Sequence, residues 1–446
     1  MRHHRFRRAI AWCAWILLVL SGSALAGQNP AESARPDVVL IVLDDLGYGD
    51  FGCYGCTDIR TPHIDRLARQ GVRLTDFYAN GPVCTPTRAA LMTGRYQQRV
   101  GLEWAISPGQ KEPGLAVEDS TLARGLKRAG YATALYGKWH LGYRAEFGPL
   151  AHGFDEFFGL LSPDIDNYSH REINGAPDLY EGDQPVERKG YMTDLITERA
   201  VAFVEKHAAE PFFLEVAYNA VHWPFQPPDR PDDIRDLETW YDGKRSDYAR
   251  MLERVDDGVG AIMTALEERG LTKQTLVIVT NDNGGEQLSR GTPLRGGKGI
   301  LLEGGIRVPC IFRWPGRLPV NKVSADLAIT MDLTATILAA AGAKPPGGRP
   351  LDGIDLAPIL NGSEPAPNRT LFWRIDRARG GQWAARYGKW KYISYVKGEL
   401  LFNLDTDLGE QIDQSRRFPD IVAAFRDEVA RWEAEMAESQ PKFLLR

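Results

Sequence analysis

The chain has 446 residues, of which 43% are hydrophobic and 25% are charged, and its formal net charge is −5. This length allows one large domain and a smaller one, and the composition is that of a globular protein. Because no basic run occurs outside the extreme N-terminus, the charge pattern argues against nucleic acid as a partner.

The first 26 residues have the pattern of a secretory signal peptide. Several arginines precede an apolar run over residues 9–20, and Ala24-Leu25-Ala26 is a small-x-small cleavage sequence. The apolar run is too short to span a bilayer comfortably. We therefore expect cleavage near Ala26, export to the periplasm or out of the cell, and no stable insertion into a membrane.

The first expected elements of the mature chain are two strands with a helix between them. The uninterrupted apolar run over residues 38–43 predicts a buried central strand, and it ends in Asp44-Asp45. A short helix is expected over residues 62–70, and a strand is expected over residues 72–78.

Next along the chain, Cys84, Pro86 and Arg88 stand at a loop-to-helix junction. Proline is tolerated in the first turn of a helix, and Gly94 suits the position after the last turn. The backbone N–H groups and the dipole at the helix N-terminus favour an anion near Cys84, and Arg88 can reach the same place from one turn further on. The pattern suits a site that holds a tetrahedral oxyanion against a reactive side chain. The alternative is a buried structural cysteine before an ordinary helix.

Strands and helices alternate through the middle of the chain, which predicts an α/β layer fold. The helices are expected over residues 120–129, 193–207 and 248–269, and the strands over residues 131–136, 212–218 and 275–280. Proline- and glycine-rich segments then place a domain boundary near residue 365. Beyond it, a small antiparallel sheet is expected from residues 371–373, 382–386, 390–394 and 400–404, with a last helix over residues 419–436. The expected organisation is a signal peptide over 1–26, a catalytic domain over 27–364 and a C-terminal α+β subdomain over 365–446.

Acidic and amide side chains follow two of the expected strands. Asp44 and Asp45 end one strand, and Asp282 and Asn283 end another more than two hundred residues later. Because the carboxyl ends of parallel strands share one edge of a sheet, these side chains are expected to meet. Three carboxylates would repel each other without a cation, and oxygen ligands favour Ca²⁺ or Mg²⁺ over zinc. Taken alone, Asp44-Asp45 is equally well explained as a solvated turn.

Four further cationic or titratable residues are candidates for the same site: Lys138, His140, His222 and Lys298. In an extended segment, residues two apart point the same way, so Lys138 and His140 are expected to face one anion. Each residue alone is more simply explained as a surface or hydrogen-bonded side chain.

The run from Cys84 to Arg88, followed by Thr93-Gly94, resembles the type I sulfatase signature Cys-x-Pro-Ser/Thr-Arg. The resemblance covers nearly the whole mature chain and is strongest to arylsulfatases and N-acetylgalactosamine-6-sulfatases. It implies an alkaline-phosphatase-like fold, in which helices sandwich a large mixed sheet and a smaller antiparallel sheet with one helix follows. It also implies hydrolysis of sulfate monoesters, and a maturation enzyme that converts Cys84 to formylglycine, whose hydrate is the nucleophile.

The resemblance assigns roles to individual residues. The metal ligands would be Asp44, Asp45, Asp282 and Asn283 with the modified Cys84, around one Ca²⁺ or alternatively Mg²⁺. Arg88, Lys138, Lys298 and the metal would neutralise the sulfuryl oxygens. His222, with Lys298, would protonate the leaving oxygen, and His140 would act as a base. Ser162 is a weaker candidate for substrate contact, because its spacing departs from the family pattern.

Two alternatives come from other classes of function. One is a phosphonate or phosphodiester hydrolase of the same superfamily, although two-metal phosphatases need more histidines beside carboxylates than this chain offers. The other is a non-catalytic sulfoglycan-binding protein, if Cys84 stays unmodified.

The segments 164–171 and 223–228 carry aromatic and polar residues that suit a sulfated sugar. The sugar, the sulfate position, endo or exo action and the oligomeric state are not specified by the sequence. Cys53 and Cys56 are expected either to form a local disulfide or to be free thiols.

Overall fold

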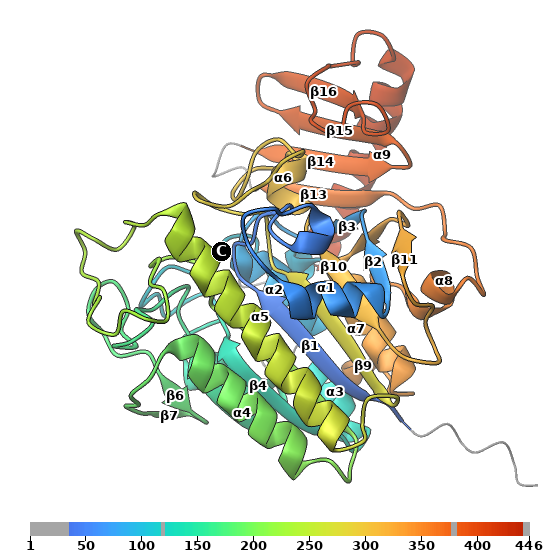
Figure 1. Cartoon of the computed structure of the whole chain (residues 1–446). Coiled ribbons are helices and arrows are strands. Elements are labelled where there is room, and N and C mark those ends of the chain that lie inside the picture. Colours follow the sequence, from blue (N-terminus) through green and yellow to red (C-terminus); the bar gives the residue numbers. More distant parts are fainter. Residues whose placement is uncertain (1–34, 117–120, 376–380, 440–446) are drawn as a thin grey trace, which may run out of the picture. The chain divides into compact units, whose positions relative to one another are not determined.

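The computed structural model describes residues 35–116, 121–375 and 381–439, so the expected signal peptide lies outside the described residues. A ten-stranded sheet dominates this part of the chain, in the order β11-β2-β10-β9-β1-β8-β4-β5-β6-β7 (Figure 1). Its central strands are β9 (Thr275–Asn281), β1 (Asp37–Leu43), β8 (Phe212–Ala217), β4 (Ala132–Lys138) and β5 (Glu156–Leu160). All pairings among these five are parallel.

The edges of the sheet make it mixed. β10 (Cys310–Arg313) runs antiparallel to β9 and pairs with β2 (Val72–Leu74), which in turn pairs with β11 (Lys322–Ser324). At the other edge lie the short strands β6 (Tyr180–Glu181) and β7 (Gln184–Pro185). The mixed α/β architecture is the one that the sequence predicts.

Helices cover both faces of this sheet because successive residues of β1 point to opposite sides. Val39, Ile41 and Leu43 belong to one hydrophobic core, and Val38, Leu40 and Val42 belong to another. The first core lies under α1 (Pro62–Arg69), α4 (Met192–Lys206) and α5 (Arg245–Glu268), as Figure 1 shows. The second lies under α2 (Cys84–Thr93), α3 (Leu122–Arg128) and α7 (Thr330–Ala340).

A second sheet of four antiparallel strands follows towards the C-terminus. Its strands are β13 (Leu371–Ile375), β14 (Gln382–Tyr387), β15 (Trp390–Tyr395) and β16 (Gly398–Asn403), in that order. One face, with Trp373, packs into a core shared with Tyr78 and Ile306, and the other packs under α9 (Pro419–Ser439). This sheet and helix confirm the smaller C-terminal unit in the expected fold.

Buried ion pairs join the C-terminal sheet to the rest of the chain. Lys391 of β15 lies 2.9 Å from Glu303 and 2.8 Å from Glu410, and none of the three has any solvent exposure. Glu303 begins α6 (Glu303–Ile306), and its backbone N–H donates to the Glu410 carboxylate (2.6 Å). The segment just before α6 carries Lys298.

The remaining elements are short. α8 spans Ala357–Asn361, and β12 (Ala328–Ile329) pairs with β3 (Phe77–Tyr78). Single turns of 3-10 helix lie at Gly52–Tyr54, Gln97–Val100, Ala145–Phe147, Leu150–His152 and Pro346–Gly348. Among the described residues, no helix combines the length and apolarity needed to cross a bilayer.

Two of the boundaries that differ from the sequence prediction have an identifiable local cause. The strand expected over residues 72–78 is split into β2 and β3, because Asp76 turns its carboxylate to Arg307 and Arg386 and the chain leaves the large sheet there. The helix expected from residue 248 begins at Arg245, where the Lys244 N–H donates to the Asp247 carboxylate (3.2 Å) and caps the first turn.

Glu215 of β8 gives a testable consequence of burial. It is 3% exposed, its Oε2 has no hydrogen-bond partner among the described residues, and burial raises its pKa to about 7. Between pH 4.5 and 7 the unfolded chain ionises this group while the folded chain keeps it protonated, so folding stability falls as the pH rises. We expect Glu215→Gln to raise the free energy of unfolding by about 2 kcal/mol at pH 8 and by much less at pH 5. Urea unfolding at both pH values measures this difference, and equal effects at the two would contradict the account.

Candidate functional site

The residues predicted to carry chemistry meet at the carboxyl ends of the parallel strands. Asp44 and Asp45 follow β1, Asp282 and Asn283 follow β9, and Lys138 ends β4. Cys84 is the first residue of α2, which starts at the same edge of the sheet. These side chains are all buried. This edge is where ligands bind in open α/β sheets.

Each carboxylate of the site has one cationic partner. Burying a carboxylate without a counter-charge is costly, and the chain supplies three cations that remove this cost. The three ion pairs are Asp44 with Lys138 (2.5 Å), Asp45 with Lys298 (2.6 Å) and Asp282 with Arg88 (2.9 Å). The protein's own cations therefore contribute to balancing the charge of these carboxylates.

Asn283 shows nevertheless that the site has unused capacity for a ligand. Its Nδ2 donates to Asp45 Oδ1 (2.7 Å) and to the carbonyl of Gly284 (2.9 Å), and its buried Oδ1 has no partner among the described residues. Buried polar atoms are rarely left without a partner. An amide oxygen that is free beside carboxylates is a suitable ligand for a hard divalent cation.

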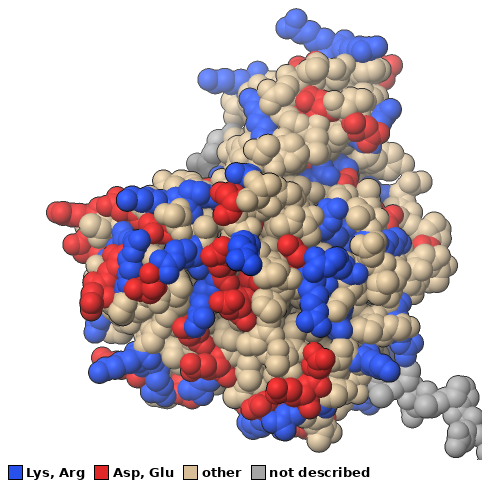
Figure 2. Space-filling view, in the orientation of Figure 1, with Lys and Arg blue, Asp and Glu red and all other residues tan. Residues whose placement is uncertain are grey.

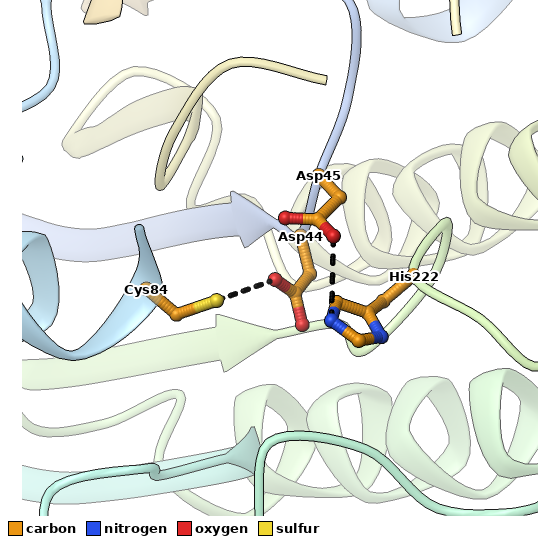
Figure 3. Close-up of side chains that lie close together, drawn as sticks. All are labelled: Asp44, Asp45, Cys84 and His222. Atoms are coloured by element: carbon orange, nitrogen blue, oxygen red, sulfur yellow. Dashed lines mark hydrogen bonds and ion pairs between the residues drawn. The ribbon is translucent and has the colours of Figure 1, made fainter. Parts of the chain in front are cut away.

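Four residues present possible ligand atoms within 4.8 Å of one another: Asp44, Asp45, Cys84 and His222 (Figure 3). Asp282, an expected ligand, is not in this group. Its Oδ2 accepts from Arg88 Nε (3.0 Å), and its Oδ1 faces the backbone N–H of Asp45 (3.4 Å). These carboxylates, with the unpaired amide oxygen of Asn283, offer oxygen ligands of the kind that a hard divalent cation prefers.

Cys84 lies at the centre of the site and is 1% exposed. Its Sγ lies 3.5 Å from Asp44 Oδ1, as Figure 3 shows. Burial raises the pKa of the Cys84 thiol well above its ordinary value, although Lys138 and Lys298 act in the opposite direction. Because the thiolate is the nucleophilic form of cysteine, an unmodified Cys84 would be a poor nucleophile. The expected helix end at Gly94 is confirmed by its left-handed φ of 65°.

His140 does not extend β4 as the sequence suggested. The strand ends at Lys138, and His140 has a left-handed φ of 55°, so the two side chains are not related by strand alternation. The carbonyl of His140 accepts from Thr85 Oγ1 (3.0 Å), and His140 Nε2 donates to the carbonyl of Ile106 (2.8 Å). Its Nδ1 is buried and has no partner within the described part of the chain. Burial, followed by the nearby Lys138, lowers the pKa of His140 well below its ordinary value, which leaves Nδ1 as a free base.

His222 and Lys298 form a hydrogen-bonded pair. His222 Nε2 lies 3.1 Å from Lys298 Nζ and 3.3 Å from Asp45 Oδ2, and Nδ1 donates to the carbonyl of Trp223 (2.9 Å). Burial and then Lys298 lower the pKa of His222 to about 4. The imidazole is therefore neutral at pH 7, and its Nε2 accepts a hydrogen bond from the Lys298 ammonium. A transferable proton is therefore held by the pair rather than by His222 alone.

Arg88 completes the arrangement from the second turn of α2. Besides its pair with Asp282, its Nη1 donates to the carbonyl of Lys138 (3.0 Å). It is 3% exposed, and the neighbouring carboxylates Asp282 and Asp44 keep its pKa above the ordinary arginine value against the effect of burial. The guanidinium is thus fixed and charged beside Cys84.

The segments 164–171 and 223–228, which the sequence suggests for binding a sugar, meet beside the His222–Lys298 pair, and Tyr241 joins them. Trp223 Nε1 donates to Asp164 Oδ2 (2.9 Å), and the Trp223 ring packs against Tyr241 with centroids 5.1 Å apart. Lys298 Nζ lies 4.9 Å from the centroid of the Trp223 ring. Tyr241 could not be linked to the site from its position in the chain. Ser162 Oγ donates to the backbone carbonyl of Asp164 (2.8 Å). Cys53 and Cys56 are free thiols.

Comparison with known proteins identifies relatives that match most of the chain. A family model described as sulfatase matches residues 36–343. N-acetylgalactosamine-6-sulfatase from Canis lupus familiaris is 34% identical to this chain and covers 96% of it, over 91% of its own length. Arylsulfatase A from Bos taurus is 37% identical over 86% of this chain and 79% of its own. The crystal structure of Ps i-CgsB in complex with k-i-k-neocarrahexaose superposes with a TM-score of 0.82 and 32% identity, covering 89% of this chain and 92% of that chain.

Proposed function

Because this chain belongs to the sulfatase family and is therefore a sulfuric ester hydrolase, we propose that it cleaves sulfate monoesters of carbohydrates with a formylglycine made from Cys84. Its fold is the alkaline-phosphatase-like fold that the resemblance implies. The observation that carries the proposal is the convergence of Cys84, at the N-terminus of α2, with three carboxylate–cation pairs at one edge of the sheet.

Formylglycine and one divalent cation would supply the chemistry that the unmodified chain lacks. Asp44, Asp45, Asp282 and Asn283, with the modified residue 84, would hold the ion. A bound divalent cation would supply a lowered pKa for one hydroxyl of the hydrated residue 84, the proposed nucleophile towards sulfur, and the second hydroxyl would allow sulfate to be released. We infer Ca²⁺, with Mg²⁺ as the alternative, because the donor atoms are oxygens.

The chain's own residues would bind the sulfate group and move protons. Arg88 and Lys138, which are buried, and Lys298, which is partly buried, would neutralise the sulfuryl oxygens. Nδ1 of His140 has the lone pair needed to take a proton from the hydrated residue 84. The Lys298–His222 pair would deliver a proton to the leaving oxygen.

A sugar substrate is supported by the surroundings of the Lys298–His222 pair. The Trp223 and Tyr241 rings and the Asp164 carboxylate form an aromatic and polar group there, and such groups stack on sugar rings and bind their hydroxyls. The relatives named above include N-acetylgalactosamine-6-sulfatase and a structure in complex with k-i-k-neocarrahexaose.

Maturation and export follow from the same proposal. We infer that residues 1–26 are removed on export, that a formylglycine-generating enzyme modifies Cys84, and that the catalytic domain spans residues 27–364 with a C-terminal α+β subdomain over 365–446. The intact mass of the peptide that carries Cys84 reports the modification directly. An unchanged thiol in active enzyme would contradict it.

Rates on defined substrates test the reaction class. The matured enzyme is expected to hydrolyse 4-nitrophenyl sulfate and sulfated galactosamine or galactose derivatives faster than matched phosphodiesters and phosphonates. Faster hydrolysis of the phosphonate or phosphodiester would instead support the other hydrolase class, and binding of sulfated glycans without any turnover would support a binding protein.

The proposed proton donor predicts a difference between leaving groups. A sugar alkoxide needs protonation as it leaves, whereas 4-nitrophenolate does not. We expect His222→Gln to lower kcat on a sugar sulfate by about 10²-fold or more and kcat on 4-nitrophenyl sulfate by less than about tenfold. Steady-state kinetics on both substrates measure this. Equal losses would assign His222 to sulfate binding rather than to proton transfer.

A further inference from the structure

A cavity lies near the amino end of β9, at the other end of the sheet from the site described above. It has a volume of about 200 Å³ and opens between α1 and α5 at the C-terminal end of β10. Its polar lining includes His63, Arg66, Gln70, Thr264, Glu267 and Arg313. β10 runs antiparallel to β9, and Arg313 pairs with Val277, which precedes Asp282 by five residues. At about 3.3 Å per residue this separates Arg313 from the active-site edge by about 15 Å.

Arg313 is a buried cation without a counter-ion. It is 5% exposed, its Nε donates to Gln70 Oε1 (2.9 Å), and its Nη1 donates to the carbonyl of Thr272 (3.3 Å). Both acceptors are neutral, and no carboxylate of the described residues lies within 4.0 Å of its guanidinium. A buried charge without an ion partner is strongly unfavourable. Burial and the neighbouring Arg66 both lower the pKa of Arg313, and Glu267 only partly offsets them.

Arg66 brings a second positive charge to the same cavity. It lies in the last turns of α1 and makes no ion pair with any residue in the described ranges. Figure 2 shows Lys and Arg side chains gathered over α1, on the face where the cavity opens. The one carboxylate in the lining, Glu267, is exposed and leaves the cavity with a net positive charge.

We propose that this cavity is an anion site that binds a tetrahedral oxyanion, a sulfate or phosphate group, between the guanidinium groups of Arg66 and Arg313. Two planar guanidinium groups suit the bidentate recognition of such an anion, and Thr264 adds a hydroxyl donor. The cavity has room for several water molecules, hence for one hydrated anion, but not for a sugar chain. A sulfated glycan could therefore reach it only with a single sulfate group.

Selenate soaking and calorimetry test the site. Selenate is a tetrahedral oxyanion whose anomalous scattering locates it in a crystal, and calorimetric titration with sodium sulfate at constant ionic strength measures affinity. The variant Arg66→Glu changes an exposed residue and places a carboxylate beside Arg313. The matched control is Arg69→Glu, the same charge change one turn further along α1 and outside the cavity lining.

We expect a selenate peak between Arg66 and Arg313 in the wild type and in Arg69→Glu, and none there in Arg66→Glu. Sulfate binding at this site should weaken by about tenfold or more in Arg66→Glu, because at least one charge-assisted hydrogen bond is lost. Arg66→Glu should also be at least as stable as the wild type in sulfate-free buffer, since Arg313 gains a partner. Absence of the peak in the wild type, or equal loss of binding in both variants, would overturn the proposal.

A second titration distinguishes the two sources of the anion. Inorganic sulfate is compared with a sulfated galactosaminoglycan tetrasaccharide in the wild type and in Arg66→Glu. If the tetrasaccharide binds at least tenfold more tightly than inorganic sulfate, and if Arg66→Glu weakens its binding, the anion is a sulfate group on a glycan. If the two ligands bind with equal affinity, and if Arg66→Glu weakens the binding of both, the anion is the free ion. If neither ligand is sensitive to Arg66→Glu, the site does not exist.

Discussion

Replacing Cys84 with serine is expected to abolish multiple turnover, lowering kcat on an aryl sulfate by about 10³-fold or more. Serine cannot be converted to formylglycine by a cysteine-specific maturation enzyme, and its single hydroxyl cannot expel sulfate by re-forming an aldehyde. An alcohol nucleophile that attacks sulfur would therefore stay sulfated. Steady-state kinetics measure the loss, and the intact mass of the variant after incubation with substrate detects the trapped sulfate ester.

The substitution is small, so the control is straightforward. The neighbourhood of residue 84 is held by Arg88 and Asp44 independently of the thiol, because each has its own ion pair. We expect the unfolding temperature of Cys84→Ser to match that of the wild type. Full turnover by Cys84→Ser, or by wild-type protein whose Cys84 peptide keeps its thiol mass, would contradict the nucleophile assignment.

The second large effect is expected on removal of the divalent ion. Dialysis against a chelator should lower kcat by about 10²-fold or more, because the ion is proposed to activate the nucleophile and to stabilise charge on the sulfuryl oxygens. The protein should nevertheless stay folded, since Lys138, Lys298 and Arg88 already balance the three carboxylates. Activity, metal content and the circular dichroism spectrum are measured on the same samples.

Adding Ca²⁺ or Mg²⁺ back to the metal-depleted enzyme distinguishes the two candidate ions. Ca²⁺ is expected to restore activity more fully than Mg²⁺, because the ligands are protein oxygens on several strands rather than ordered waters. Full activity after verified removal of metal would refute a role for the ion. Unfolding on chelation would show that the ion, and not the cationic side chains, balances the carboxylates.

Much of the fold could be predicted because it depends on local pattern. The apolar run before Asp44 could only be a buried strand, and the acidic groups after β1 and β9 met because parallel strands end at one edge. The position of Cys84 at the start of α2 followed from its proline and glycine context.

Other features depend on contacts between distant segments and left no local signal. The left-handed backbone of His140 is held by Thr85 and Ile106, and the hydrogen bond to His222 Nε2 depends on Lys298, 76 residues later. The sequence also did not show which cation pairs with which carboxylate, because the partners are far apart in the chain and only the fold brings them into contact. The strand over residues 72–78 was split by Asp76, whose two arginine partners lie 231 and 310 residues later in the chain.

The buried Glu303–Lys391–Glu410 cluster limits how this enzyme can be re-engineered. Removing everything after residue 364 would take Lys391 away from the buried Glu303 carboxylate and leave Arg307 (3.1 Å) as its cationic partner, directly after the segment that carries Lys298. The C-terminal piece is therefore not a detachable module. Chimeras that exchange it between sulfatases should keep Lys391 and Glu410 together with the recipient's Glu303, or they will disturb the segment that carries Lys298.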